Sequence, residues 1–214
     1  MASAMMIYGM AYLYGMCGST SFEVIKDRLV ASGMSPAIMV STILIFAGLG
    51  YKIAAVPFHM WCPDVYEGAP TPITAFFSVA PKAAGFAIII RFFTQVIGPS
   101  EAISHLLATV AILTMTAGNL SALLQNNLKR LLAYSSIAHA GYILMAVAMI
   151  TPAGNQAVLL YLAIYLFMNM GAFMVVILVS KQIKQINPIN PLTNSGEDIK
   201  DYEGLGWRMP YVGV

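Results

Sequence analysis

Apolar residues form long runs along this chain, and short polar segments separate the runs. An apolar run of about 20 residues can cross the hydrocarbon core of a bilayer as a single α-helix. Six runs of this kind predict about six transmembrane helices. They cover residues 1–16, 36–61, 72–97, 105–125, 131–150 and 155–181.

The segments after the last run have a different character. Residues 184–208 are polar and rich in Asn, Pro, Gly and acidic side chains, which predicts a loop outside the membrane. The chain turns apolar again over residues 209–214, which we interpret as the start of a further, truncated helix. Because the run at 1–16 is also short for a complete span, we expect a fragment of a larger helical bundle.

Composition supports the membrane interpretation and argues against other classes. Apolar residues make up 59% of the chain and charged residues 9%, and the mean hydropathy is +0.76. These values lie outside the range of soluble domains. The net charge of +2 offers no basic surface for nucleic acid. Cys17 and Cys62 are far apart without a CxxC motif, so we expect an all-α integral membrane protein in lipid that binds no metal or cofactor itself.

Lys and Arg are distributed unevenly among the connections between the predicted helices. The connection at 126–130 and the segment after the last run carry six of them, whereas the loops at the opposite ends of the helices carry two. Cytoplasmic connections carry the excess of Lys and Arg. Residues 62–71, 126–130 and 184–208 are therefore predicted on the cytoplasmic side, and without a signal or transit peptide we take a bacterial inner membrane as the expected location.

Two lysines lie inside apolar runs at the same depth. Lys52 is nine residues from Trp61, and Lys82 is ten residues from Pro72. At a rise of 1.5 Å per residue both lie about 14–15 Å from one end, near the midplane of a core about 30 Å thick. A charge at that depth costs about 2.5–3.5 kcal/mol. We therefore interpret both lysines as proton-transfer residues, and no acidic residue within a predicted span is available as a partner.

Other polar residues lie at a similar level. His139 is a candidate proton relay, with Ser135 one turn before it, and a buried histidine with satisfied hydrogen bonds is the open alternative. Asn119 and Asn169 are candidates for the same polar axis, or for simple hydrogen bonds between helices.

Prolines close to both lysines predict irregular helices. Pro57 cannot donate to the carbonyl of Ile53, and Pro81 cannot donate to that of Phe77. A freed carbonyl in a membrane needs another partner or water. We predict helix breaks at Pro57 and Pro81, with packing kinks as the alternative.

Four stretches of the sequence resemble a known family, the antiporter-like membrane subunits of respiratory complex I. They are GYKIAAVPFHMW at 50–61, PDVYEGAPTP at 63–72, NLKRLLAYSSIAH at 127–139 and DYEGL at 201–205. The second stretch, and the pair formed by Pro81 and Lys82, are most similar to the subunit N branch of NADH-quinone oxidoreductase. The resemblance covers the sixth to eleventh of that family's about fourteen helices.

The resemblance implies a subunit that moves protons across the membrane while electrons pass from NADH to quinone in other subunits. Lys52 corresponds to the lysine of the family's broken seventh helix, and Lys82 to the lysine of its eighth. His139 borders the family's hydrophilic axis. NADH, FMN, iron–sulfur clusters and quinone are implied for the complex as a whole, and the implied partners are its other membrane subunits.

Three alternatives to this assignment are open. A subunit of a cation/proton antiporter would show sodium-dependent transport, and a membrane-bound hydrogenase would copurify with different subunits. A non-conducting membrane scaffold would tolerate Leu in place of both lysines.

Overall fold

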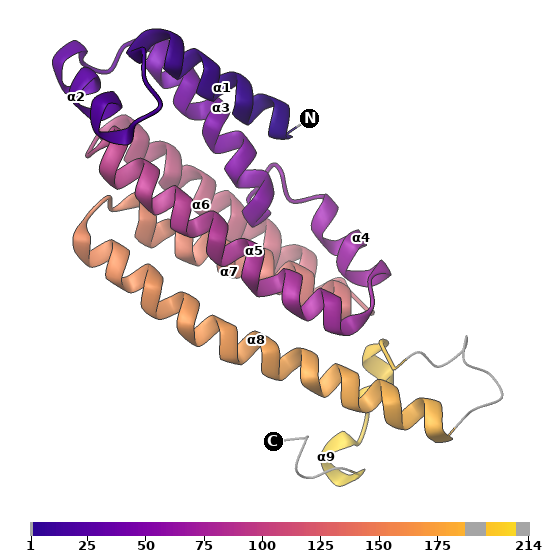
Figure 1. Ribbon diagram of the computed structural model, residues 1–214. Coiled ribbons are helices and arrows are strands. Elements are labelled where there is room, and N and C mark those ends of the chain that lie inside the picture. Colours follow the sequence, from indigo (N-terminus) through magenta and orange to yellow (C-terminus); the bar gives the residue numbers. More distant parts are fainter. Residues whose placement is uncertain (1, 187–195, 209–214) are drawn as a thin grey trace.

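The computed structural model describes residues 2–186 and 196–208, which are almost entirely helical (Figure 1). This confirms the predicted all-α class. The elements are α1 (Ala2–Cys17), α2 (Phe22–Ser32), α3 (Pro36–Ile53), α4 (Trp61–Gly68), α5 (Thr71–Arg91), the π-helical η1 (Phe92–Ile97), α6 (Glu101–Ala122), α7 (Leu128–Ala148), α8 (Pro152–Ile186), the 3₁₀ turn η2 (Ile199–Tyr202) and α9 (Leu205–Arg208).

Within the described chain, five helices are long and apolar enough to cross a membrane. They are α3, α5 with η1, α6, α7, and α8 as far as Ile183. The helix α1 follows the first apolar run but has only 16 residues. Counted with α1, the bundle agrees with the predicted number of about six. Residues 209–214, where a further helix is predicted, lie outside the described residues, as does part of the predicted loop at 184–208.

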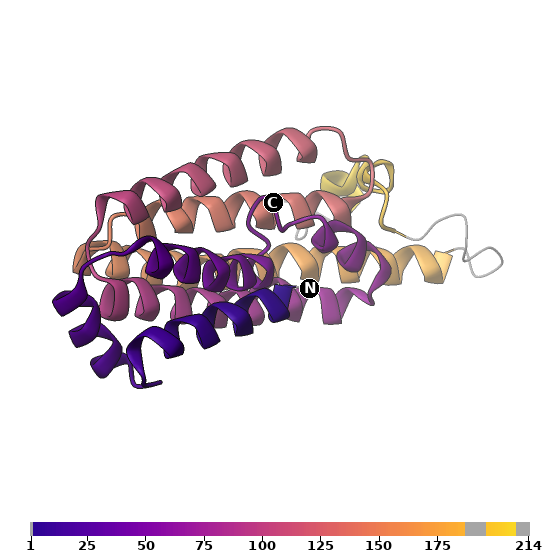
Figure 2. The same ribbon diagram turned by 90° about the horizontal axis from the view of Figure 1, so that it is seen from above.

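The helices pack in pairs that join into one bundle (Figures 1 and 2). Helix α6 packs along α7, α1 packs along α3, and α8 lies against both α5 and α7. Small residues allow the closest approaches, as expected for helices that associate in a membrane. At Gly9, where the Ser41 hydroxyl donates to the carbonyl at 2.7 Å, α1 meets α3 directly.

The helix break predicted near Pro57 is present. Helix α3 ends at Ile53, Ala54 takes a left-handed conformation with φ of 58°, and helix resumes only at Trp61. The predicted span 36–61 is therefore too long at its end, because the left-handed residue and the proline together stop the helical hydrogen-bond ladder. Figure 1 shows α4 beyond the interruption, where the sequence predicts only a turn.

Two other expectations need correction. Helix α5 continues through Pro81, so this proline does not break the helix; a proline removes one backbone hydrogen bond, and a tightly packed membrane helix tolerates that loss. Residues 17–35, where a loop is expected between the first two predicted spans, contain the 11-residue helix α2. Its buried residues Ile25 and Leu29 lie one turn apart and pack against the core. The surrounding polar residues make this helical spacing hard to recognise in the sequence.

Candidate functional site

Helix α5 places Lys82 in the interior of the bundle. Ser78, Lys82 and Phe86 recur at four-residue spacing on the buried face of this helix, and Lys82 is only 3% exposed. Its Nζ donates to the carbonyl oxygen of Ser136 on α7 at 2.7 Å and also to the Ser136 hydroxyl. A lysine in an apolar helix is thus held by neutral oxygens of a neighbouring helix.

Ser78 extends this polar contact one turn along α5 towards α8. Asn169 Nδ2 donates to the Ser78 hydroxyl, and Tyr165 Oη donates to the Ser78 carbonyl at 3.4 Å. Asn169 is 5% exposed and Tyr165 2%. Polar groups of α5, α7 and α8 therefore form a buried polar layer, which we define by Lys82, Ser136, Ser78, Asn169 and Tyr165.

His139 lies one turn after Ser136 on α7 and borders the polar layer. Its Nδ1 is 2.7 Å from the hydroxyl of Tyr161 on α8, and its ring lies 5.3 Å from that of Tyr165, centre to centre. The imidazole is half-buried, on the turn of α7 that follows the serine holding the Lys82 amine. The structure therefore brings His139 close to Lys82 without a direct hydrogen bond between them.

Asn119 lies apart from this layer. Its Nδ2 donates to the hydroxyl of Tyr142 at 3.0 Å, and the Asn119 side chain is exposed on α6. Tyr142 in turn packs against His139, with ring centres 5.8 Å apart. Ser135 is half-buried and makes no hydrogen bond through its side chain to a described residue. The serine that contacts Lys82 is the next one along the chain.

Lys52 is not part of the buried layer. It lies in the last turn of α3, and its side chain is exposed. A Cβ added at Gly85 of α5 would lie 4.0 Å from the Lys52 Cβ, so Lys52 is level with a point three residues beyond Lys82, about 4.5 Å along α5. The two lysines share a level, but one points into the bundle and the other out of it.

The interruption after α3 leaves backbone groups unpaired beside Lys52. In a continuous helix the amide of Val56 would donate to the Lys52 carbonyl, but it donates instead to the hydroxyl of Thr114 on α6 at 3.1 Å. The proline ring of Pro57 has no N–H for the carbonyl of Ile53. No described residue donates a hydrogen bond to either carbonyl. These oxygens are available to water or to a protonated group.

Charged residues gather at one end of the bundle. Lys129 is 3% exposed, and its Nζ contacts the Ala69 carbonyl at 3.1 Å and the Glu197 carboxylate at 2.8 Å. Arg130 contacts Asp64 and Glu67 of α4, each at 2.8 Å. The start of α7, helix α4 and the segment around Glu197 therefore meet at the same end of the bundle, and the segment around Glu197 pairs with the residues that precede α7.

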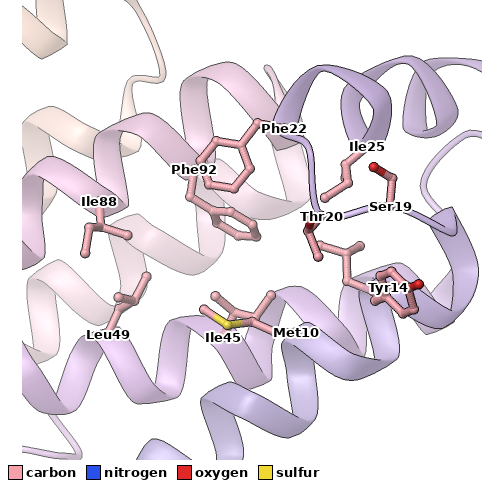
Figure 3. A pocket seen from close by; sticks show the side chains of 11 residues that line it. Met10, Tyr14, Ser19, Thr20, Phe22, Ile25, Ile45, Leu49, Ile88 and Phe92 are labelled. Carbon is pink, nitrogen blue, oxygen red and sulfur yellow. The ribbon is translucent and has the colours of Figure 1, made fainter.

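A separate cavity of about 160 Å³ lies between α1, α2, α3 and the end of α5 (Figure 3). Apolar side chains such as Leu13, Ile45 and Phe92 line it, and none of its lining residues is charged. None of its lining residues belongs to the polar layer. Elsewhere too, no three His, Cys, Asp or Glu side chains of the described residues converge as metal ligands.

The profile of a single protein family, described as the NADH:quinone oxidoreductase/Mrp antiporter transmembrane family, matches residues 1–214. The chain belongs to this family. Subunit N of NADH-quinone oxidoreductase from Anaeromyxobacter sp. (strain Fw109-5) is 47% identical over 235 residues, which cover 100% of this chain and 43% of the relative. Subunit N 2 from Chloroherpeton thalassium is 48% identical over 98% of this chain and 40% of the relative. The resemblance to the subunit N branch is confirmed, and the chain spans about two fifths of the length of these relatives.

Solved structures of the family share the fold. Respiratory complex I from Thermus thermophilus with bound aureothin contains a chain 43% identical to this one, with a TM-score of 0.67 over 82% of this chain and 37% of that chain. An archaeal membrane-bound sulfane sulfur reductase matches with a TM-score of 0.80 and 31% identity over 99% of this chain and 41% of that chain. The Mrp complex from Dietzia sp. DQ12-45-1b matches with a TM-score of 0.75 and 26% identity over 82% and 32%.

Lys82 of the buried polar layer is named from the sequence, but most of the residues that surround it are not. Lys82, His139 and Asn169 lie in or beside the polar layer, whereas Lys52 and Asn119 are exposed. The partners missed were Ser78, Ser136, Tyr161 and Tyr165. The four-residue spacing of Ser78 to Lys82, and of Tyr161 to Tyr165 to Asn169, is the signal that would have placed these polar groups on common faces.

Proposed function

We propose that this chain provides a proton-conducting part of the membrane arm of NADH-quinone oxidoreductase, with Lys82 as the residue that takes up and releases the proton. The observation that carries the proposal is the burial of the Lys82 amine between α5 and α7. No carboxylate among the described residues pairs with it. Because no fixed negative charge holds its proton, the amine can exchange that proton with water or hydroxyls of the layer.

The proton transfer follows from the charges in the layer. When Lys82 is protonated, its ammonium donates to Ser136; when it gives up a proton to a water molecule, a neutral amine remains and can accept another. A change of charge near the amine shifts the balance between these states, since electrostatic interactions are strong where water is scarce. Electron flow elsewhere in the complex would supply that change.

Lys52 and His139 take supporting roles in this proposal. The unpaired carbonyls beside Lys52, at the break near Pro57, stabilise a protonated group or ordered water on the outer face of α3. His139 exchanges a proton with Tyr161 at 2.7 Å and extends the route towards α8. Asn169 and Asn119 orient their neighbours by hydrogen bonding.

The surroundings are proposed from the relatives. The relatives are more than twice as long as this chain, and we propose the other membrane subunits of the complex as its partners. NADH, FMN, iron–sulfur clusters and quinone belong to the complex as a whole. We place the end of the bundle that carries Lys129 and Arg130 on the cytoplasmic side of a bacterial inner membrane, since positive charge favours that side.

The test compares proton uptake with electron flow in inverted membrane vesicles that carry the full-length subunit. With Lys82→Ala we expect the number of protons taken up per NADH oxidised to fall while the complex still assembles. Lys26→Ala, an exposed lysine on α2, is the matched control and should leave this ratio unchanged. An unchanged ratio with Lys82→Ala would refute the proposal.

A second candidate function is a subunit of a cation/proton antiporter, which the likeness to the Mrp complex favours. The two functions differ in the ion and in the partner subunits. Transport that depends on sodium and continues without NADH would favour the antiporter. Copurification with dehydrogenase subunits would favour the complex I assignment.

A further inference from the structure

Tyr66 has a buried hydroxyl whose hydrogen bonds the fold leaves open. The side chain is 1% exposed on the inner face of α4, and its ring packs edge-on against Phe173 of α8 with centres 6.4 Å apart. Its backbone carbonyl accepts from the Thr74 hydroxyl at 3.2 Å. The hydroxyl itself has no hydrogen-bond partner among the described residues. A buried hydroxyl without a partner costs about 1–3 kcal/mol, so its presence requires an explanation.

The polar surroundings of this hydroxyl belong to the Lys82 layer. Tyr66 packs in one buried cluster with Cys62 and with Ala133 and Ile137 of α7, which lie on the turns of α7 that carry Ser136. Ser136 is also the residue that holds the Lys82 amine. Cys62, which is 0% exposed, belongs to the same cluster as Tyr66. Tyr66 and Lys82 therefore contact the same part of α7 from two different helices.

The opposite face of α4 leads to the charged end of the bundle. Asp64 and Glu67 lie on either side of Tyr66 in the sequence and point away from the core, where they contact Arg130. Helix α4 thus lies between Lys82 and this charged end, and Tyr66 supplies its buried hydroxyl. Water that entered past α4 would meet the Tyr66 hydroxyl before it reached Ser136.

We propose that the Tyr66 hydroxyl is a proton-transfer residue that connects Lys82, through Ser136, to the charged end of the bundle. The inference rests on the proposed function of Lys82. In this step a water molecule on the α4 side gives a proton to Tyr66 Oη as the Tyr66 O–H bond passes its own proton, through a water molecule between the two hydroxyls, to Ser136 Oγ. The Ser136 hydroxyl hands its proton to the neutral Lys82 amine, so the lysine gains a proton, the water on the α4 side becomes hydroxide, and Tyr66 and Ser136 end unchanged.

This exchange does not need a tyrosinate. Burial raises the pKa of the Tyr66 hydroxyl above its ordinary value, so the group stays protonated at neutral pH. It accepts one proton as it donates the other, as hydroxyls in hydrogen-bonded chains do. A tyrosine kept only for its packing would need the ring and not the oxygen, and Phe would then serve equally well.

Tyr66→Phe separates the two explanations, because it removes only an oxygen that no described residue contacts through a hydrogen bond. In the full-length subunit we expect normal assembly and normal NADH oxidation. The number of protons taken up per NADH should fall by at least half of the decrease that Lys82→Ala causes, and the fall should deepen as the pH rises and water protons become scarcer. Tyr14→Phe, at an exposed tyrosine of α1, should change neither ratio nor pH profile.

The possible outcomes distinguish this inference from the proposed function. If Lys82→Ala lowers the ratio and Tyr66→Phe does not, the inference is wrong and the function of Lys82 stands. If neither variant lowers it, the proposed function is wrong first. A Tyr66→Phe subunit that no longer assembles would show that the hydroxyl is structural, and this too would overturn the inference.

Discussion

Two glycines set how closely α6 and α7 approach, and their replacement should destabilise the bundle. A Cβ added at Gly118 of α6 would lie 2.7 Å from the backbone nitrogen of Ala138 and 3.0 Å from its Cα. A Cβ at Gly141 of α7 would lie 2.8 Å from the nitrogen of Met115 and 3.0 Å from the Ala111 carbonyl. Because the obstructing atoms are mainly backbone, rotation of a side chain cannot relieve the clash.

The magnitude follows from the separation that an extra methyl group requires. Carbon contacts are comfortable at about 3.5–4.0 Å, so α6 and α7 would have to move apart by most of an ångström. Overpacking of this kind costs about 1–3 kcal/mol, and the higher helix propensity of Ala returns up to about 1 kcal/mol. We expect a net loss of about 1–2 kcal/mol for Gly118→Ala and for Gly141→Ala.

Thermal unfolding of the purified full-length subunit in detergent measures this loss as a lower Tm. Gly171→Ala on α8 is the control, because a Cβ there meets no atom within 4 Å, and it should not lower Tm. The double variant should lose less than the sum of the single losses, since the first substitution already parts the helices. Additive losses, or single variants as stable as the control, would refute this account of the interface.

Three further predictions concern charged and reactive groups. Glu197→Gln removes the carboxylate that lies 2.8 Å from the buried Lys129 amine, and it should destabilise the subunit by about 3 kcal/mol. A lower Tm would show this loss, and an unchanged Tm would contradict it. Ser136→Ala removes one oxygen from the Lys82 amine and should lower proton uptake per NADH, whereas the same change one residue earlier should not. Burial raises the pKa of the Cys62 thiol, so less thiolate is present at any pH; native protein should react with maleimide at this residue only after denaturation, as a mass spectrum of labelled peptides would show.

The sequence allowed the fold to be predicted further than the site. Apolar runs near the length of a membrane span identify helices well, because the bilayer fixes that length. Residue counts also predict that both lysines lie at a similar level along the bundle. Depth, however, says nothing about the direction in which a side chain points around the helix axis. Lys82 points inwards and Lys52 outwards at nearly one level, and only the packing of α3 against α5 decides this.

The same limit explains why the candidate named from the sequence is Ser135, whereas the serine that contacts Lys82 is Ser136. Ser135 and Ser136 differ by about 100° around α7, and the close contact at Gly118 and Gly141 fixes which of them faces α5. The short helix α4 was missed because its eight residues include a proline near its start and two acidic residues, a composition typical of a turn. Tertiary contacts with α7 stabilise it as a helix.

Helix α4 has only eight residues, and its two carboxylates and its buried tyrosine lie on different faces of it. A rotation about its axis that brought Tyr66 out of the core would carry Asp64 and Glu67 away from Arg130 at the same time. The ion pairs of Arg130 with Asp64 and Glu67 therefore help to fix the orientation of the buried Tyr66 hydroxyl. Salt in the surrounding solution weakens exposed ion pairs, so the ionic strength outside the bundle would change the geometry around the buried Lys82 amine.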